Sequence, residues 1–434
     1  MKSHRIPAHV PQATYRLSCR GCGSLSIVPL FSLGNLCLCN MFVRPTDEEV
    51  RVPLDLVMCD RSRKGCGLVQ LRHTTPGDLM YRQYWYQSGI SSLMREHLSA
   101  LAQKAEAAAG VKRGDIVLDI GCNDGTTLRG YRTPGITRVG FEPNQLYRKA
   151  AKAGAFVIND YFNADGFRKA FGRRKAKVVT SLAMFYDLED PARFIGDVRS
   201  CLAPEGLWIL ELHYLGTMIE DNGFDAIVQE HVTYYSLNSL RRLLQAGGFR
   251  VDDVELNGMN GGSFRLYVRH RTAKAAAPAG GRSRVIALDK RERAMRLEDP
   301  ATYHAFERRV RLERERLLAF LRKARSAGKT TYIYGASTKG NALLQYYGLG
   351  PDLIAGAADK NADKWGLHTA GSMIPIMSPD EVARRKPDYL LVLIWHLLDE
   401  VAAQWRDWIQ AGGRLVAPLP AVRIVGPEAG SISK

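Results

Sequence analysis

The stretch GDIVLDIGCNDGTTLRGY, residues 114–131, decides how the rest of the chain is understood. Residues 116–120 form a short apolar run, which is typical of a parallel strand buried on both faces. The run ends in a glycine-rich turn, and a helix is expected directly after it. Such a turn brings backbone N–H groups close to a ligand. The candidate ligand contacts in this stretch are Asp119, Gly121, Asn123, Asp124 and Gly125.

Further strands are expected at 137–144, 155–160, 176–188 and 206–215, with helical patterns between them. This alternation predicts a doubly wound α/β sheet that binds its ligand at the carboxyl ends of the strands. Glu142, at the end of the second strand, can accept hydrogen bonds from both hydroxyls of a ribose. Asp160 and Ser181 are further candidates on the third and fourth strands. Because the turn has the form E/DxGxxxG rather than GxGxxG, the predicted cofactor is S-adenosylmethionine (SAM).

The cysteines indicate a metal site. Six of the eight lie in the first 66 residues, and such clustering favours metal over disulfides in a cytosolic chain. The pairs Cys19-x2-Cys22 and Cys59-x6-Cys66 are the predicted ligands of a structural Zn²⁺. Cys37 and Cys39 are either small buried side chains or competitors for the ligand role.

The stretch QEHVTYYS, residues 229–236, follows the fifth strand and therefore lies at the end of the sheet where the ligand is expected. His231 at that place would serve as a general base, oriented by Glu230, with Tyr234 or Tyr235 donating a hydrogen bond to substrate. The alternative is a core histidine packed among aromatic rings. Further on, Asn260, Gly262 and Ser263 allow the backbone to approach a substrate, or form a plain turn between two strands.

The C-terminal part repeats the order of strand, glycine turn and helix, in TTYIYGASTKGNALLQYY at 330–347. Ser337, Thr338 and Lys339 open that helix, whose N–H groups and dipole attract anions. They are the candidate contacts for the phosphate groups of a substrate. The alternative for Ser337 is ordinary N-capping.

The chain of 434 residues is too long for one ordinary core, so several domains are expected. These are a zinc-binding module at 1–89, a SAM-dependent methyltransferase domain with a catalytic insert at 90–270, a linker and basic helix at 271–329, and a second Rossmann-like domain at 330–434.

The net charge of +17 permits an anionic partner. Between Arg282 and Arg325, however, both signs alternate at helical spacing, which favours an exposed helix with ion pairs over a nucleic-acid interface. No run reaches 18 apolar residues, and the first ten residues lack the apolar centre of a secretory signal. We therefore expect no nucleic acid, no membrane contact and a cytoplasmic location.

With these motifs in place, the chain resembles the SAM-dependent deoxysugar C-methyltransferases, which act on nucleotide-linked 4-keto-6-deoxysugars. The resemblance covers nearly the whole chain. It is carried by the cysteine module, YWYQSG (84–89), NDGTTL (123–128), FDAIVQEHVTYYS (224–236), NGGSFRLYV (260–268), YGASTKGNALLQ (334–345) and ADKNADKWG (358–366). In the family the insert usually reads YHEH or CHEH. Glu230 and His231 match its last two residues, whereas Val228 and Gln229 replace the first two.

The resemblance implies removal of the proton at sugar C3, which the C4 ketone makes acidic, and attack of the resulting enolate on the SAM methyl group. A base and hydrogen-bond donors for the enolate oxygen are needed. His231 is the expected base, and the candidate donors are Tyr84, Tyr86, Tyr234 and Asn260. The partner would be a dTDP- or GDP-linked ketosugar, and the choice between monomer and dimer stays open. The alternatives are an O- or N-methyltransferase, or a non-catalytic scaffold that binds zinc and nucleotide.

Overall fold

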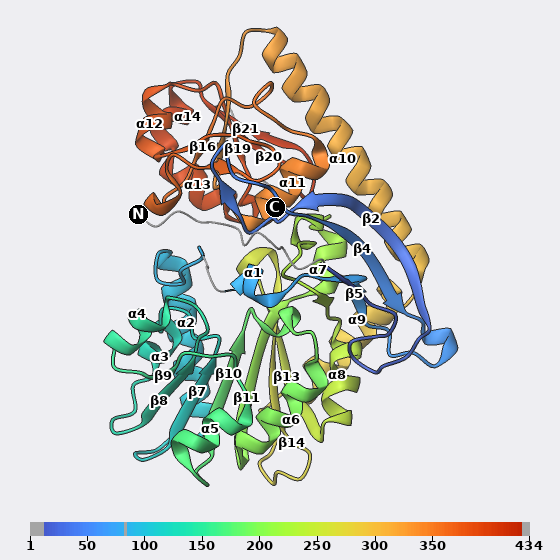
Figure 1. Ribbon diagram of the computed structural model, residues 1–434, viewed down its shortest axis with the longest axis vertical. Coiled ribbons are helices and arrows are strands. Elements are labelled where there is room, and N and C mark those ends of the chain that lie inside the picture. Colours follow the sequence, from blue (N-terminus) through green and yellow to red (C-terminus); the bar gives the residue numbers. More distant parts are fainter. Residues whose placement is uncertain (1–12, 82–84, 428–434) are drawn as a thin grey trace.

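The computed structural model describes residues 13–81 and 85–427. Two α/β units lie at opposite ends of the molecule, and the long N-terminal strands run between them (Figure 1). Within the described residues, no helix is both long and apolar enough to cross a lipid bilayer.

The middle unit is built on a seven-stranded sheet, as the alternating pattern predicted. Its strand order is β13-β14-β11-β10-β7-β8-β9, and only β14 runs antiparallel to its two neighbours. Chain order reverses between β7 and β10, and an open α/β sheet binds its ligand beside such a point. The strands are β7 (Ile116–Ile120), β8 (Thr137–Phe141), β9 (Phe156–Ile158), β10 (Ala176–Leu182), β11 (Leu202–His213), β13 (Phe249–Asn257) and β14 (Ser263–His270).

Helices cover both faces of this sheet. Every residue of β7 is buried, as expected for a central parallel strand. On one face, Trp208 of β11 packs among the rings of Phe185, Phe194 and Phe249. The helices are α2 (Ser92–Ala109), α3 (Thr126–Gly130), α4 (Tyr147–Lys152), α5 (Ala164–Phe171), α6 (Pro191–Cys201), α7 (Leu215–Glu220) and α8 (Leu237–Ala246).

The N-terminal module is a four-stranded antiparallel sheet, in the order β12-β5-β4-β2. Its edge strand β12 (Thr233–Tyr234) belongs to the insert of the middle unit, so the two regions share one sheet. A second shared pair joins β3 to β17 of the C-terminal unit. The remaining elements are β1 (Thr14–Tyr15), β2 (Ile27–Cys37), β3 (Phe42–Val43), β4 (Arg51–Cys59), β5 (Val69–Leu71), β6 (His73–Thr74), η1 (Arg61–Arg63) and α1 (Gly77–Tyr81).

The C-terminal unit has a six-stranded sheet in the order β18-β16-β15-β19-β20-β21, parallel except at β21. Chain order reverses beside β15, so the loop before α11 occupies the ligand position of this sheet. The elements are β15 (Thr331–Tyr334), α11 (Thr338–Tyr347), β16 (Ala357–Ala358), β17 (His368–Thr369), β18 (Ile376–Met377), α12 (Pro379–Arg384), β19 (Tyr389–Val392), α13 (Leu398–Gln404), α14 (Arg406–Gln410), β20 (Arg414–Ala417) and β21 (Arg423–Val425).

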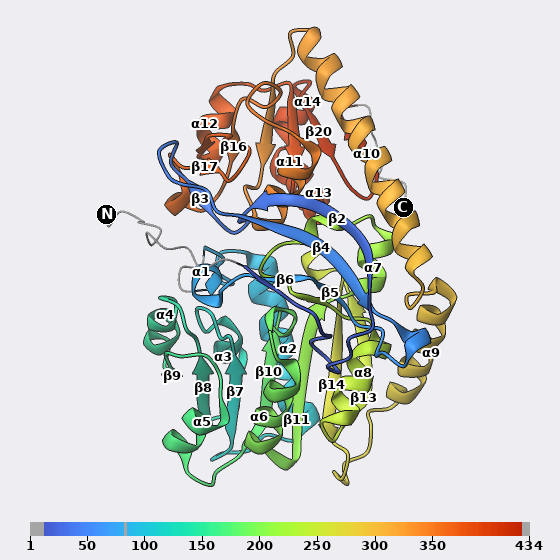
Figure 2. The same cartoon turned by 45° about the vertical axis from the view of Figure 1, so that its right-hand side comes forward.

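The charge-rich segment between these units forms two helices, α9 (Gly281–Met295) and α10 (Pro300–Ser326). Figure 2 shows α10 running along one side of the molecule. Ion pairs within α10 join Arg311 to Glu307 and Arg316 to Glu313. Buried Glu292 of α9 accepts hydrogen bonds from the first backbone amides of α8, which fixes α9 against the middle unit.

Candidate active site

The loop after β7 has the backbone that its glycines and asparagine suggested. Gly121, Asn123 and Gly125 all adopt positive φ, at 72°, 50° and 79°. A Cβ on Gly125 would lie 2.9 Å from the Cα of Ala150, so only glycine fits there. The loop sits at the carboxyl end of β7, beside the point where strand order reverses, and this is where a nucleoside-containing cofactor would bind.

Two buried carboxyl groups flank this loop. Glu142 accepts hydrogen bonds from the backbone amides of Asn123 at 2.7 Å and Asn144 at 3.3 Å, which leaves lone pairs for ribose hydroxyls. Asp119 accepts a hydrogen bond from Thr180 Oγ1 at 2.6 Å. Burial raises the pKa of each carboxyl to about 7. These carboxyl groups fit the ribose of SAM, whose hydroxyls would donate hydrogen bonds to them.

Asn123 and Asp124 hold the segment 86–89 against the loop. Asn123 Oδ1 accepts from the amide of Ser88 at 3.1 Å, and Asp124 Oδ2 accepts from the amide of Gly89 at 2.8 Å. Tyr86, whose carbonyl accepts from Asn123 Nδ2, therefore lies beside the cofactor loop and is about half exposed, at 47%. Tyr84, a second candidate from the same motif, lies outside the described residues.

The other two candidate cofactor contacts differ in their surroundings. Asp160 is exposed at the end of β9, and its carboxylate accepts a hydrogen bond from the amide of Tyr161. Ser181 is fully buried within β10, and its Oγ accepts from Trp208 Nε1 at 3.2 Å. The Ser181 hydroxyl therefore pairs the buried indole inside the sheet.

His231 lies in the loop between η3 (Phe224–Ala226) and β12, with its side chain 12% exposed. Its Nδ1 is 2.9 Å from the carbonyl oxygen of Ala226 and donates to it, since a carbonyl only accepts. In the neutral ring Nε2 therefore carries the lone pair. Burial, aided by the nearby Lys339 ammonium, lowers the pKa of His231 to about 3. The ring is thus neutral at ordinary pH and ready to accept a proton.

Glu230 does not form the hydrogen bond that was expected to orient the His231 ring. Its Oε1 lies 3.9 Å from His231 Nε2, beyond hydrogen-bond distance, so the Ala226 carbonyl orients the imidazole in its stead. Burial raises the pKa of Glu230 to about 7, and its Oε2 has no partner among the described residues.

A small cavity opens in front of His231. Its lining comes from the loop after β10, the end of β11, the first residue of α7 and the insert: Tyr186, His213, Leu215, His231, Thr233 and Tyr234. The Tyr186 ring meets the imidazole edge-on, with 4.4 Å between centroids. Tyr234 is thus brought to the same cavity as His231, although its hydroxyl oxygen is fully buried.

The turn at η4 (Met259–Gly261) leads into β14, whose first residue, Ser263, pairs with His213 of the cavity lining. Gly262 has a φ of 109°, and a Cβ there would lie 2.2 Å from Thr217 Cγ2. Ser263 donates its hydroxyl hydrogen to the carbonyl of Met259 at 3.0 Å, which closes the turn. The carbonyl of Asn260 accepts from Lys339 Nζ at 2.7 Å, so this turn is fastened to the C-terminal unit.

The start of α11 brings the C-terminal unit to the site. Ser337 is the N-cap, and its Oγ accepts from the amide of Gly340 at 3.0 Å; Thr338 is the first helical residue. Burial lowers the pKa of Lys339, while the carboxylate of Asp225 opposes that shift. A partly buried cation thus contacts the middle unit across the boundary between the two units.

The sequence analysis missed three residues around Lys339. His213 ends β11, His396 lies in η6 (Trp395–Leu397), and Asp225 accepts from Trp395 Nε1 at 2.9 Å. Burial and the Lys339 charge lower the pKa of His213 well below its usual value and that of His396 to about 3. The signal for His213 was available, because it ends the fifth strand on the edge where the ligand was expected.

The predicted zinc ligands come together as one cluster. The sulfur atoms of Cys19, Cys22, Cys59 and Cys66 all lie within 4.8 Å of one another. Cys19 and Cys66 are 3.5 Å apart and Cys22 and Cys59 are 3.6 Å apart, close to the ~3.8 Å edge of a tetrahedron with 2.3 Å Zn–S bonds. The amides of Gly21 and Cys66 donate to the sulfurs of Cys19 and Cys59. Four thiolates fit a closed, structural Zn²⁺ site.

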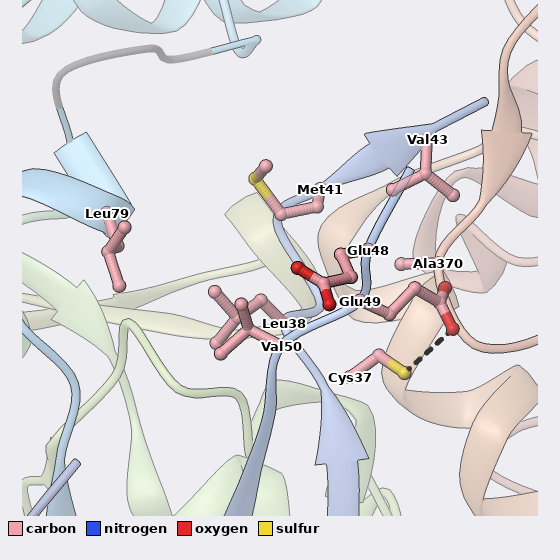
Figure 3. A pocket seen from close by; sticks show the side chains of 9 residues that line it. All are labelled: Cys37, Leu38, Met41, Val43, Glu48, Glu49, Val50, Leu79 and Ala370. Atoms are coloured by element: carbon pink, nitrogen blue, oxygen red, sulfur yellow. Dashed lines mark hydrogen bonds between the residues drawn. The ribbon is translucent and has the colours of Figure 1, made fainter. Parts of the chain in front are cut away.

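Cys37 and Cys39 lie outside that cluster, which resolves the alternative that the spacing left open. They follow at the far end of β2, and Cys37 Sγ donates to Glu49 Oε2 at 3.2 Å. Figure 3 shows this contact beside a largely apolar pocket, lined by Leu38, Met41, Val43, Glu48, Val50, Leu79 and Ala370 as well as Cys37 and Glu49.

The two unusual residues of the insert have structural partners. Val228 is buried in a small cluster with Cys39 and Ala342. Gln229 is 2% exposed; its Oε1 accepts from the amide of Cys39, and its Nε2 donates to the carbonyls of Leu36 and Cys37. Both side chains face the N-terminal module, so they fasten the insert to β2.

The fold and these two sites define a class. A doubly wound sheet with a glycine-rich loop and an acidic residue on the second strand, next to a four-cysteine zinc module, belongs to a SAM-dependent methyltransferase.

Comparisons with known proteins identify the family. Residues 19–81 match a family model described as "Putative zinc binding domain", residues 86–254 a methyltransferase domain, and residues 258–420 a C-methyltransferase C-terminal domain. The chain is 32% identical over 415 residues to C-methyltransferase NovU of Streptomyces niveus, with 94% of this chain and 97% of that protein covered. The protein therefore belongs to this family of SAM-dependent C-methyltransferases.

Two solved methyltransferase structures show a weak similarity to the chain. Mitomycin 7-O-methyltransferase MmcR is 16% identical and covers 41% of this chain and 54% of its own, with a TM-score of 0.33. Magnesium protoporphyrin IX methyltransferase from Synechocystis PCC 6803, with bound SAH, is 15% identical and covers 43% and 90%, also with a TM-score of 0.33. At these values the similarity says nothing about the substrate.

Proposed function

We propose that this C-methyltransferase acts on a nucleotide-linked 4-keto-6-deoxysugar, at the carbon beside the ketone, with C3 as the favoured position. The observation that carries the proposal is the tautomer of His231. Its Nδ1 is committed to the Ala226 carbonyl, and its unprotonated Nε2 belongs to a ring that lines the cavity. A neutral imidazole held in this way is suited to remove a proton from carbon.

The reaction follows from ordinary enolate chemistry. The C–H bond beside the ketone breaks, the proton moves to His231 Nε2, and the electron pair forms an enolate. The enolate carbon then forms the new carbon–carbon bond. SAM, when bound at the β7 loop, supplies the electrophilic methyl group, and the carbon–sulfur bond breaks with its electrons going to sulfur. A positioned base contributes about 10²- to 10⁴-fold to such a step.

The C-terminal unit would hold the nucleotide. Lys339 is a partly buried cation at the start of α11, where backbone N–H groups and the helix dipole add positive potential. A diphosphate there would leave the sugar on the side of the cavity. The dTDP and GDP sugars share this diphosphate, so an assay has to identify which nucleobase the substrate carries.

The test is isotopic. The enzyme is incubated in D₂O with dTDP- and GDP-linked 4-ketosugars, and the products are analysed by mass spectrometry and NMR. A C-methyltransferase gives a product with one added methyl on carbon, and His231→Ala abolishes both deuterium uptake and methylation. An O- or N-methyltransferase would add the methyl without any exchange at carbon, and that result would refute the proposal.

A further inference from the structure

His213 is a second imidazole at the cavity that the proposed function leaves without a task. It is the last residue of β11 and lines the cavity together with His231. The two rings come from different elements, one from the central sheet and one from the insert. Within the part of the chain that the structure describes, the His213 ring forms no hydrogen bond.

The position of His213 is rigid. Its backbone pairs with Ser263 in β14, and the next amide, that of Tyr214, donates to the carbonyl of Gly262 at 3.0 Å. Two residues earlier, buried Glu211 is held by His97 at 2.5 Å and Arg265 at 2.7 Å. A side chain on such a strand end is placed more firmly than one on a loop.

The two imidazoles differ in what they can do. His231 donates Nδ1–H to the Ala226 carbonyl, so its neutral ring offers the cavity a lone pair. A neutral His213 ring also has one N–H and one lone pair, but neither is used by the described chain. Burial and the Lys339 ammonium lower its pKa well below the usual value, so it stays neutral. It therefore retains an N–H that can be given to substrate.

We propose that His213 donates a hydrogen bond to the ketone oxygen of the substrate and stabilises the enolate that His231 generates. This inference rests on the proposed function and extends it by naming the group that takes the developing charge. No proton need be transferred: the N–H···O bond shortens as charge moves onto oxygen, while the carbon proton goes to His231 Nε2. The sequence analysis had placed this task on tyrosines and Asn260.

Two tyrosines at the cavity are the competing donors. The Tyr234 hydroxyl is buried and, among the described residues, has no hydrogen-bond partner. Tyr186 packs its ring on His231. Burial raises the pKa of both hydroxyls well above the usual value, so both stay protonated. A direct comparison of variants separates Tyr186 from His213.

The experiment measures exchange and transfer separately. Wild type, His213→Phe, His213→Gln, Tyr186→Phe and His231→Ala are each incubated in D₂O with dTDP-4-keto-6-deoxyglucose or GDP-4-keto-6-deoxymannose, first without and then with SAM. His213→Phe is expected to slow deuterium exchange and methylation alike by about 10²- to 10³-fold, with KM little changed, as for loss of one oxyanion donor. His213→Gln restores part of both rates because its amide can donate. His304→Phe, which removes an exposed imidazole on α10 away from the site, serves as the control.

The outcomes are distinct. If His213→Phe exchanges and methylates like wild type while His231→Ala is inactive, the role of His213 is wrong and the proposed function stands. Loss in Tyr186→Phe alone assigns the donor to tyrosine and also overturns the inference. If wild type methylates without exchange, or neither exchanges nor methylates either ketosugar, the proposed function fails and the inference fails with it. Affinity for SAM and thermal unfolding, measured on each variant, show that a lost rate reflects chemistry and not misfolding.

Discussion

Gln229 offers a test of why this chain departs from its family at the insert. The structure predicts that Gln229 is a structural tether. Its side chain is 2% exposed and forms three hydrogen bonds to the end of β2, with the Cys39 amide and with the carbonyls of Leu36 and Cys37. Gln229→Met keeps the length of the side chain and removes all three bonds.

The expected loss of stability in Gln229→Met comes mainly from one buried N–H group that would lose its hydrogen-bond acceptor. The Cys37 carbonyl keeps a second partner, since Gln345 Nε2 donates to it at 3.2 Å. The backbone amide of Cys39 is buried, and it donates its hydrogen bond to Gln229 Oε1. A buried donor left without a partner costs about 1–3 kcal/mol, so Gln229→Met should lower stability by that amount.

Urea unfolding, followed by fluorescence, measures the loss, and the first transition is compared because a chain of several units need not unfold in one step. Hydrogen exchange should accelerate at the end of β2 and in the insert. Gln103→Met, on the exposed face of α2, is the matched control and should change nothing. The tether is refuted if Gln229→Met keeps full stability and loses methylation as severely as His231→Ala, for then Gln229 would act on the substrate.

The remaining predictions concern pH, zinc and the cofactor. With the pKa of His231 at about 3, kcat at saturating SAM should show no loss from protonation of this ring near pH 6.5, where an ordinary histidine would protonate; a pH profile checks this. Because only the unfolded state binds that proton between about pH 6.5 and 3, His231 should lower stability progressively as pH falls through this window, and His231→Gln should flatten the loss in urea titrations. Cys22→Ser, or chelation of the metal, should unfold the N-terminal module, seen as released Zn²⁺ and faster proteolysis before residue 81; an unchanged digest would argue against a structural metal. Glu142→Gln should weaken SAM binding about 10-fold or more in calorimetry, since a charged hydrogen bond contributes about 1.5–3 kcal/mol; unchanged affinity would place the ribose elsewhere.

What the sequence could predict was local in character. The buried run at 116–120, the turn at Gly121 and Gly125, and the pairs Cys19-Cys22 and Cys59-Cys66 each express their chemistry within a few residues. Period and spacing therefore sufficed for the middle sheet and the metal cluster. The same holds for the first strand of the C-terminal sheet, which is an apolar run followed by a glycine turn and a helix.

The missed features depend on contacts between distant segments. Val228 and Gln229 look like lost catalytic residues in the sequence, and only the fold reveals Cys39 and Ala342 beside them. The orienting partner of His231 was assigned to the adjacent Glu230, but a loop that turns back brings the Ala226 carbonyl to Nδ1 instead. Neighbours in sequence were thus favoured over neighbours in space.

The zinc module is connected by hydrogen bonds to the insert that carries His231, and can therefore influence catalysis without touching the substrate. Between Cys19 and Cys22, the amide of Arg20 donates to Gln70 Oε1 at 2.8 Å, and Gln70 pairs with Thr233 across β5 and β12. The amide of Leu71 adds a bond of 2.9 Å to the carbonyl of Val232.

The metal loop is therefore joined through one strand to the residues that directly follow His231. An insert of so few residues has little core of its own, and strand pairing with a metal-braced sheet restricts where its imidazole can lie. Since a base misplaced by about 1 Å can lose 10²-fold in rate, damage to the zinc cluster should lower kcat even where SAM still binds the middle unit.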